Sequence, residues 1–284
     1  MSWHVHPDVI LWIALIEAVY LYGLRAVGRP RGLRASPTQV AWFSLGVAVL
    51  YLGAGTPIHD IAEQRLFSVH MVQHMLFTLV APPFLLLGTP DWLVLPVLEQ
   101  RRLRRVARFL TRPAVAFTLF NLVTAVTHLP DVGDAALRHH WFHFILHVVL
   151  LGSALLMWWP VLSPTTLLPR LSEPLQMVYL FLQSFVPTVL ASFITFSSTV
   201  WYEFYAQAPR LWGISAIEDQ RYAGLIMKLG GGVILWLAIG IIFFRWVARE
   251  ERKERTTATE LRWEDVEEEL RRMGLTKPPS RRAR

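Results

Sequence analysis

Four histidines form two pairs in which the members stand four positions apart. His70 and His74 lie in HMVQHM, and His143 and His147 lie in HFILH. On an α-helix this spacing places both imidazoles of a pair on one face. Imidazole is a common ligand of copper, zinc, iron and nickel. One pair alone more often indicates hydrogen-bonded histidines, but two pairs at one depth of a membrane favour a metal site, because polar groups are costly there.

Other potential ligands are expected at a similar depth in the membrane. His128 ends an apolar segment, and Asp219 and Met227 occur two turns apart in IEDQRYAGLIMK. Three roles are open for Asp219: it binds the metal, it orients a histidine that does, or it caps a helix. Met71 and Met75 are soft donors beside the first pair, although ordinary packing explains them slightly better.

The sequence contains no cysteine. Disulfides, thiol redox chemistry, iron–sulfur clusters and thiolate metal sites are therefore excluded together. A transition metal bound to this chain must use imidazole, thioether, carboxylate, amide or backbone ligands.

The elements that position these residues are predicted to be membrane-spanning helices. Hydrophobic residues make up 54% of the 284 residues, and apolar segments long enough to cross a bilayer recur along the chain. We predict an all-α polytopic membrane bundle of about seven transmembrane helices. Because the N-terminus lacks a signal-peptide pattern, we expect the first span to stay in the mature protein. The predicted spans are 8–27, 38–56, 66–87, 113–130, 140–160, 175–198 and 223–247.

The distribution of arginine predicts the orientation of the bundle. Arginines are concentrated in the loops at 28–37 and 88–112, whereas the alternate loops hold few. The positive-inside rule then places the N-terminus outside and the C-terminus in the cytoplasm, in a plasma (inner) membrane. Because the net charge of +7 arises from these short loops and the tail, it does not indicate nucleic-acid binding.

Two domains are expected. Residues 1–248 form the seven-span transmembrane domain, and residues 249–284 form a charged cytoplasmic tail. Within the tail, Trp263, Val266, Leu270 and Met273 recur at helical spacing, which predicts a short amphipathic helix before a solvated RRAR end.

With this topology, every histidine of the chain falls at the outer end of the bundle. The ten are His4, His6, His59, His70, His74, His128, His139, His140, His143 and His147. Two charges are expected inside spans: Glu17, protonated or paired, and Lys228, near enough to an end to snorkel. Kinks are expected at Pro82-Pro83 and Pro187.

Several segments resemble the CtaG family of cytochrome c oxidase assembly factors, the multi-span type associated with caa3-type oxidases. The most specific segment is SVHMVQHMLFTLVAPPFLLLGTP at 68–90. THLP (127–130), HFILH with MWWP (157–160), YLFLQSFVPTVLASFITFSSTVWYEFY (179–205) and EDQRYAGLIMK (218–228) are similar to its later segments in order and spacing. The resemblance covers about 38–247.

The resemblance implies a metallochaperone that delivers or inserts copper on the extracytoplasmic side while haem–copper oxidase of the respiratory chain matures. It implies no enzymatic activity, and as partners oxidase subunits, the lipid bilayer and further copper chaperones. The residues that carry over are His70, His74, His128, His143, His147, Asp219, Gln220, Gly224 and Met227. Lys228 departs from the expected apolar residue.

Three other functions remain open at the level of sequence. A haem-binding membrane cytochrome would use histidines of the third and fifth spans as axial ligands. A channel or transporter would need polar residues through the whole membrane depth, whereas here they gather in the outer half apart from Glu17. A metal-free scaffold would need none of these residues as ligands.

Overall fold

The long apolar segments form helices that run side by side. The computed structural model describes residues 7–275, and these residues contain no β-strand. The helices that lie in the predicted spans are α1 (Pro7–Gly23), α2 (Pro37–Ala54), α4 (Phe67–Met75), α5 (Ala81–Gly88), α8 (Pro113–Thr127), α10 (His140–Leu162), α11 (Glu173–Phe196), α13 (Ala216–Leu225) and α14 (Gly231–Arg272). The connecting helices are α3 (Pro57–Gln64), α6 (Asp91–Glu99), α7 (Arg101–Leu110), α9 (Pro130–Arg138) and α12 (Glu203–Gln207).

The described residues include six helices that are long and apolar enough to cross a membrane. They are Val9–Arg31, Pro37–Ala54, Phe67–Gly88, His140–Leu162, Glu173–Phe196 and Ala216–Thr256. The predicted fourth span is shorter: α8 reaches the required length only together with α7, from which it is bent by 70°. The prediction of an all-α membrane bundle is therefore confirmed, with six spans or seven if the bent pair counts as one.

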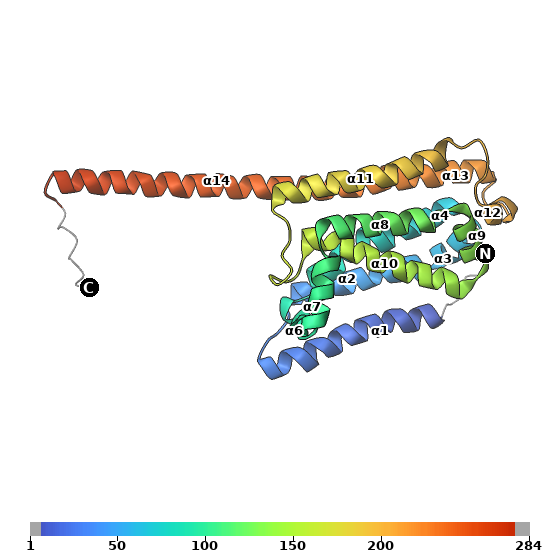
Figure 1. The fold of residues 1–284 in the computed structure, drawn as a ribbon, viewed down its shortest axis with the longest axis horizontal. Helices are drawn as coiled ribbons and strands as arrows, with labels where there is room; N and C mark the ends of the chain where they lie inside the picture. Colours follow the sequence, from blue (N-terminus) through green and yellow to red (C-terminus); the bar gives the residue numbers. More distant parts are fainter. Residues whose placement is uncertain (1–6, 276–284) are drawn as a thin grey trace. The chain divides into compact units, whose positions relative to one another are not determined.

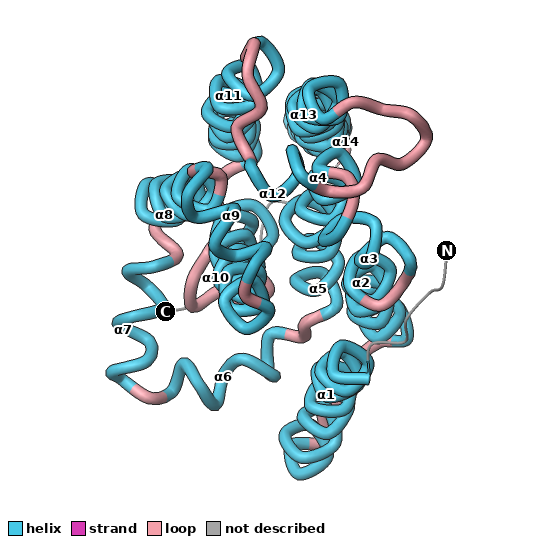
Figure 2. Tube along the Cα trace, turned by 90° about the vertical axis from the view of Figure 1, so that its right-hand side faces the viewer, coloured by secondary structure: helices cyan, strands magenta, loops and turns pink. Residues whose placement is uncertain are grey.

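Viewed along the helices, α4 and α5 lie in the middle of the bundle (Figure 2). The elements α2, α10 and α13 pack directly against this central span. Phe67–Gly88 is the most buried of the six spans, whereas Val9–Arg31 is the least buried and packs chiefly on α2. The histidines of α4 thus lie in the centre of the bundle.

Three spans contain a π-helical turn, namely η1 (Leu24–Gly28), η3 (Leu76–Val80) and η4 (Ile226–Gly230). The turn η3 comes directly before the proline pair predicted to kink the third span. Pro82 has no N–H to donate to the carbonyl of Thr78, and the Trp158 indole N–H donates to that oxygen instead, at 3.0 Å. This bond joins α10 to the central span just beyond His74.

Close packing of α2 against α5 depends on a glycine. A Cβ atom at Gly88 would overlap the backbone of Phe43. The Gly88 carbonyl accepts a hydrogen bond of 2.8 Å from Tyr20 of α1, whose ring stacks on Phe43. Small residues allow membrane helices to approach closely in this way.

The bundle has two chemically different ends. The short helices α3, α9 and α12 lie at the same end as the starts of α4 and α13 (Figure 1). We call it the histidine end, because the described histidines lie in α3, in the first turns of α4 and α10, or beside α9. They are His59, His70, His74, His128, His139, His140, His143 and His147. His4 and His6 fall outside the described residues. The arginine-rich α7 lies at the opposite end.

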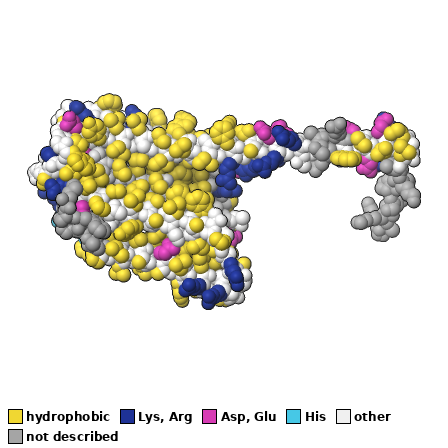
Figure 3. Space-filling view, turned by 180° about the vertical axis from the view of Figure 1, so that it is seen from behind, with side chains coloured by type: hydrophobic (Ala, Val, Ile, Leu, Met, Phe, Trp, Pro, Cys, Tyr) yellow, Lys and Arg dark blue, Asp and Glu magenta, His cyan; other side chains and the backbone are white. Residues whose placement is uncertain are grey.

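The chain divides into two compact units, residues 1–239 and 240–284. Many apolar side chains lie on the surface of the first unit (Figure 3), as lipid contact requires. Leu11, Phe185 and Phe193 are among the exposed ones. In the second unit, α14 continues without a break to Arg272, past the predicted boundary at 248/249. Trp263 and Met273 are exposed there, and the predicted RRAR end lies outside the described residues.

Candidate metal centre

The start of α4 is fixed by a carboxylate from another helix. Asp219 of α13 is fully buried and accepts hydrogen bonds from the N–H groups of Phe67 (2.7 Å) and Ser68 (3.1 Å). The Ser68 hydroxyl donates to it as well, at 2.5 Å. Because both carboxylate oxygens accept hydrogen bonds from the first residues of α4, Asp219 caps the helix that carries His70 and His74.

The two predicted histidine pairs meet across the interface between α4 and α10. The ring centroids within each pair lie 4.3 Å apart for His70 and His74, and 4.2 Å apart for His143 and His147. Between the helices, the Nε2 atoms of His74 and His147 are 3.3 Å apart. Both helices begin at the histidine end, and His74 and His147 each lie about two turns into their helix, so they stand at the same level.

His128 joins this group from the end of α8. Its Nδ1 lies 2.7 Å from the Thr124 carbonyl oxygen, and its ring centroid lies 5.2 Å from that of His74. A proton on Nδ1 completes the bond to Thr124 and leaves Nε2 as the free lone pair. This is the usual arrangement of a metal-binding histidine, whose second nitrogen is held by a carbonyl.

Several ring nitrogens of the cluster are buried without a hydrogen-bond partner. They are Nδ1 of His70, Nδ1 of His74, Nε2 of His128 and Nε2 of His143. A buried polar atom without a partner costs about 1–3 kcal/mol, and four in one cluster are expensive in a membrane protein. A bound cation would satisfy such nitrogens.

The distances between the potential ligand atoms fit a small cation. Ligand atoms of His70, His74 and His147 lie within 4.8 Å of one another, and so do those of Glu63, His143 and His147. A tetrahedral first-row ion with nitrogen ligands at about 2.0 Å holds them about 3.3 Å apart, which matches the 3.3 Å between His74 and His147. The residues present therefore fit a thiolate-free transition metal.

Sequence reasoning missed Glu63. Its Oε1 lies 3.2 Å from Nδ1 of His143 and 3.1 Å from Nδ1 of His59. Burial raises the pKa of the Glu63 carboxyl, but the hydrogen bond from His143 and the electrostatic influence of the nearby His143 and His59 rings outweigh it and lower the pKa below its usual value. The carboxylate therefore stays ionised. The available signal was the i,i+4 spacing of His59 and Glu63 before the third span.

Two tyrosines of the loop around α12 close the cluster at the histidine end. Tyr202 donates to the His128 carbonyl at 2.8 Å, and Tyr205 donates to the Ala62 carbonyl at 2.6 Å. Burial and the nearby charges of Glu63 and Asp219 raise the pKa of Tyr205 well above its ordinary value, so it remains a donor. Both rings line a cavity of about 30 Å³ beside His70 and His74.

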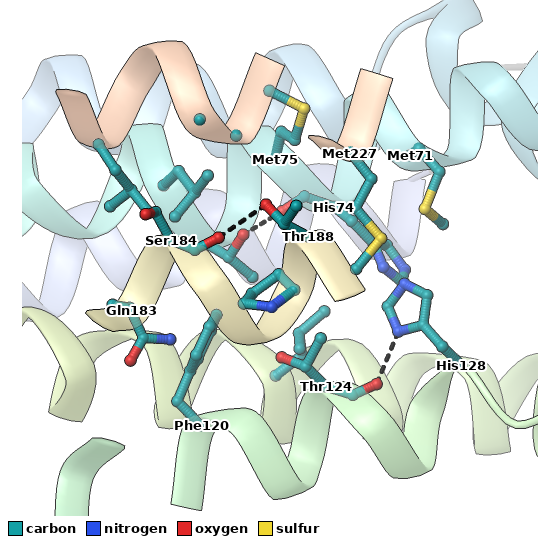
Figure 4. Close-up of a pocket in the computed structure, with 17 residues that line it drawn as sticks. Met71, His74, Met75, Phe120, Thr124, His128, Gln183, Ser184, Thr188 and Met227 are labelled. Carbon is teal, nitrogen blue, oxygen red and sulfur yellow. Dashed lines mark hydrogen bonds between the residues drawn. The ribbon is translucent and has the colours of Figure 1, made fainter. Parts of the chain in front are cut away.

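Three methionines line a second cavity, of about 60 Å³, on another side of His74. Met71, Met75 and Met227 surround it together with His74 and His128 (Figure 4). Met75 fits here because Gly230 has no side chain. A Cβ atom at Gly230 would lie 2.7 Å from the terminal methyl carbon of Met75. Met227 thus contributes a thioether to the space that His74 and His128 also line, as expected for a soft ligand near the cluster.

The family model described as cytochrome c oxidase caa3 assembly factor (CtaG) matches residues 18–249 of the chain. The chain belongs to this family. The matched residues contain every histidine of the cluster as well as Glu63, Asp219 and the three methionines.

Curated relatives of this CtaG-family chain occur in mycobacteria. An uncharacterized protein of Mycobacterium bovis is 29% identical over 260 residues, which cover 84% of this chain, and so is one of Mycobacterium tuberculosis. An uncharacterized protein of Mycobacterium leprae is 25% identical over 250 residues, or 82% of this chain. The match spans only 38% of each relative's length. No solved structure matches the chain.

The other residues of the CtaG-like segment EDQRYAGLIMK have structural roles. The Gln220 amide accepts from the Trp201 N–H at 2.7 Å and donates to the Thr199 carbonyl at 3.0 Å, so it holds the loop after α11. A Cβ atom at Gly224 would overlap the Thr195 hydroxyl, so this glycine allows α13 to pack on α11. These two residues therefore hold the surrounding helices and loop in place.

The two charges predicted inside spans have neighbours. The Ser44 hydroxyl donates to Glu17 at 2.7 Å. The Lys228 ammonium lies 5.8 Å from the centroid of the Phe196 ring, within cation–π range. Neither residue belongs to the groups of potential ligands in the histidine cluster. His139 does not belong to them either, and its side chain is exposed.

Proposed function

We propose that this CtaG-family chain binds copper in its histidine cluster and delivers it to cytochrome c oxidase during assembly. In this role the copper ion is cargo, and the chain acts as a metallochaperone and not as an enzyme. The family supplies the connection with the oxidase. The histidine cluster supplies the nitrogen ligands that copper needs.

The main support for this proposal is that imidazole nitrogens without hydrogen-bond partners lie close to methionine thioethers. The sequence has no cysteine that could supply a thiol instead. His70, His74 and His147 offer nitrogens at distances suited to one ion, and methionine sulfur lines the adjoining cavity. Nitrogen and thioether ligands favour copper over magnesium, calcium or manganese, which prefer oxygen. Copper also stands at the top of the affinity order among divalent first-row metals.

Haem fits this cluster poorly. A haem held by two axial histidines lies between their ring nitrogens. The 3.3 Å between Nε2 of His74 and Nε2 of His147 leaves no space for a macrocycle. The cavity beside them, of about 30 Å³, holds about a single water molecule.

We assign the histidine end to the outer face of the plasma membrane. The arginines of η2 (Arg29–Arg31) and α7 lie at the opposite end, which the positive-inside rule places in the cytoplasm. Copper would thus enter and leave on the extracytoplasmic side, where a soluble copper chaperone supplies it and an oxidase subunit accepts it.

The test uses cells that lack the chain and express it from a plasmid as wild type, as the double variant His70→Ala/His74→Ala, or as His139→Ala. The copper-to-haem ratio of the purified oxidase is measured. We expect wild type and the exposed-histidine control His139→Ala to restore the ratio, and the double variant to leave the oxidase copper-deficient while its own membrane level is normal. A normal ratio with the double variant would refute copper delivery by these histidines.

A further inference from the structure

His143 and His147 form a wall between two cavities. On one side is the cavity of about 30 Å³, which is also lined by His70 and His74. On the other side is a cavity of about 410 Å³ between α1, α2, α3 and α10, which is also lined by Glu63. Among the described residues, only the two wall histidines line both cavities, so each side has its own set of further ligands.

The inner side offers neutral ligands only. His70 and His74 complete a set with His147, and the sulfurs of Met71, Met75 and Met227 lie around the next cavity. Tyr202 and Tyr205 close this side and stay protonated.

The outer side offers a carboxylate. Glu63, His143 and His147 place their ligand atoms within 4.8 Å of one another. His143 is 5% exposed, and its Nε2 is buried without a partner, so it has a nitrogen available beyond its contact with Glu63. The 410 Å³ cavity leaves room for water as an additional ligand.

We infer that the cluster contains two metal positions with different preferences, one on each side of the His143–His147 wall. The outer position, Glu63–His143–His147, takes Cu²⁺, and the inner position, His70–His74–His147, takes Cu⁺. His147 belongs to both sets of ligands. This inference rests on the proposed function, because it assumes that copper is the cargo.

The assignment of oxidation states follows from the ligand types. A carboxylate and water are hard ligands, and the negative charge of Glu63 favours the divalent ion over the monovalent one. Neutral imidazoles with thioethers nearby suit Cu⁺, which does not need charged ligands. A single centre with Glu63 only orienting His143 would instead bind both ions through the same residues.

The test measures both affinities of the purified full-length chain in detergent. Competition with bicinchoninate under anaerobic conditions gives the affinity for Cu⁺, and competition with glycine, followed by electron paramagnetic resonance, gives the affinity for Cu²⁺. The variants are Glu63→Gln, His74→Ala and His147→Ala. Glu203→Gln removes an exposed carboxylate at the same end and serves as the control.

We expect Glu63→Gln to weaken Cu²⁺ binding by about tenfold or more and to leave Cu⁺ binding unchanged, since removing a ligand or its partner typically costs that much. His74→Ala should do the reverse, and His147→Ala should weaken both. If Glu63→Gln proves unfolded in a thermal melt, Glu63→Asp, which keeps the charge, is expected to weaken Cu²⁺ alone.

Two results overturn the inference and leave the proposed function standing. In the first, the wild type binds copper but Glu63→Gln weakens both ions equally, which means one centre. In the second, Glu63→Gln changes neither affinity. Failure of the wild type to bind copper in either state refutes the proposed function itself, and the two positions with it.

Discussion

The Nε2 atoms of His74 and His147 lie 3.3 Å apart, although 73 residues separate them in the chain. One comes from α4 in the centre of the bundle and the other from α10 beside it. At this distance two neutral imidazoles either form a hydrogen bond with each other or bind the same metal ion. The partnerless nitrogens around them favour the ion.

Replacing Asp219 by asparagine should weaken copper binding without removing a ligand. The carboxylate caps the helix that carries His70 and His74, and loss of a charged buried cap costs about 1–3 kcal/mol. We expect a lower melting temperature and a lower copper affinity, with an unchanged X-ray absorption spectrum of the bound copper. Asp131→Asn, at an exposed position, is the control. A spectrum that loses an oxygen ligand in Asp219→Asn would show that Asp219 binds the metal.

Replacing Met227 by leucine separates the chemistry of the thioether from its packing. Leucine has a similar volume, so the stability cost should stay below about 1.5 kcal/mol. We expect weaker Cu⁺ binding, measured by bicinchoninate competition, because a soft ligand is lost next to His74 and His128. Met157→Leu, at a fully buried methionine outside this cavity, should leave Cu⁺ affinity unchanged. Equal effects of the two variants would mean that Met227 serves packing alone.

Replacing Gly224 by alanine should destabilise the bundle. The new Cβ atom would overlap the Thr195 hydroxyl and lie 2.8 Å from the Ala191 carbonyl oxygen, so α13 must move away from α11. Overpacking of this kind costs about 1–3 kcal/mol. Thermal unfolding in detergent measures the change. Gly152→Ala, where nothing lies within 4 Å of the new atom, should be neutral or stabilising, since alanine is the better helix former. An unchanged melting temperature for Gly224→Ala would contradict the packing described here.

The helices and the histidine pairs were predictable because both depend on local patterns. Apolar length determines a span, and the structure has spans close to five of the seven predicted ranges. The predicted span 223–247 lies within the longer helix Ala216–Thr256. The exception is 113–130, where α8 is short and bends away from α7. The i,i+4 spacing likewise predicted that His70 lies next to His74 and His143 next to His147.

Contacts between distant segments were not predictable in the same way. Nothing near Asp219 in the chain shows that its carboxylate reaches the N–H groups of Phe67 and Ser68, about 150 residues earlier. Glu63 was missed for a similar reason, because its contact with His143 exists only once α3 folds over the start of α10. Such pairings depend on tertiary packing, which local sequence patterns do not encode.

X-ray absorption spectroscopy of the purified chain loaded with Cu⁺ shows directly whether the histidine cluster binds copper. We expect one retained ion with nitrogen ligands at about 2.0 Å, as is usual for imidazole bound to a first-row metal, and loss of the ion in the double variant His74→Ala/His147→Ala. His139→Ala should retain it. Copper retained by the double variant with an unchanged spectrum, or no copper retained by the wild type, would contradict copper binding by these histidines.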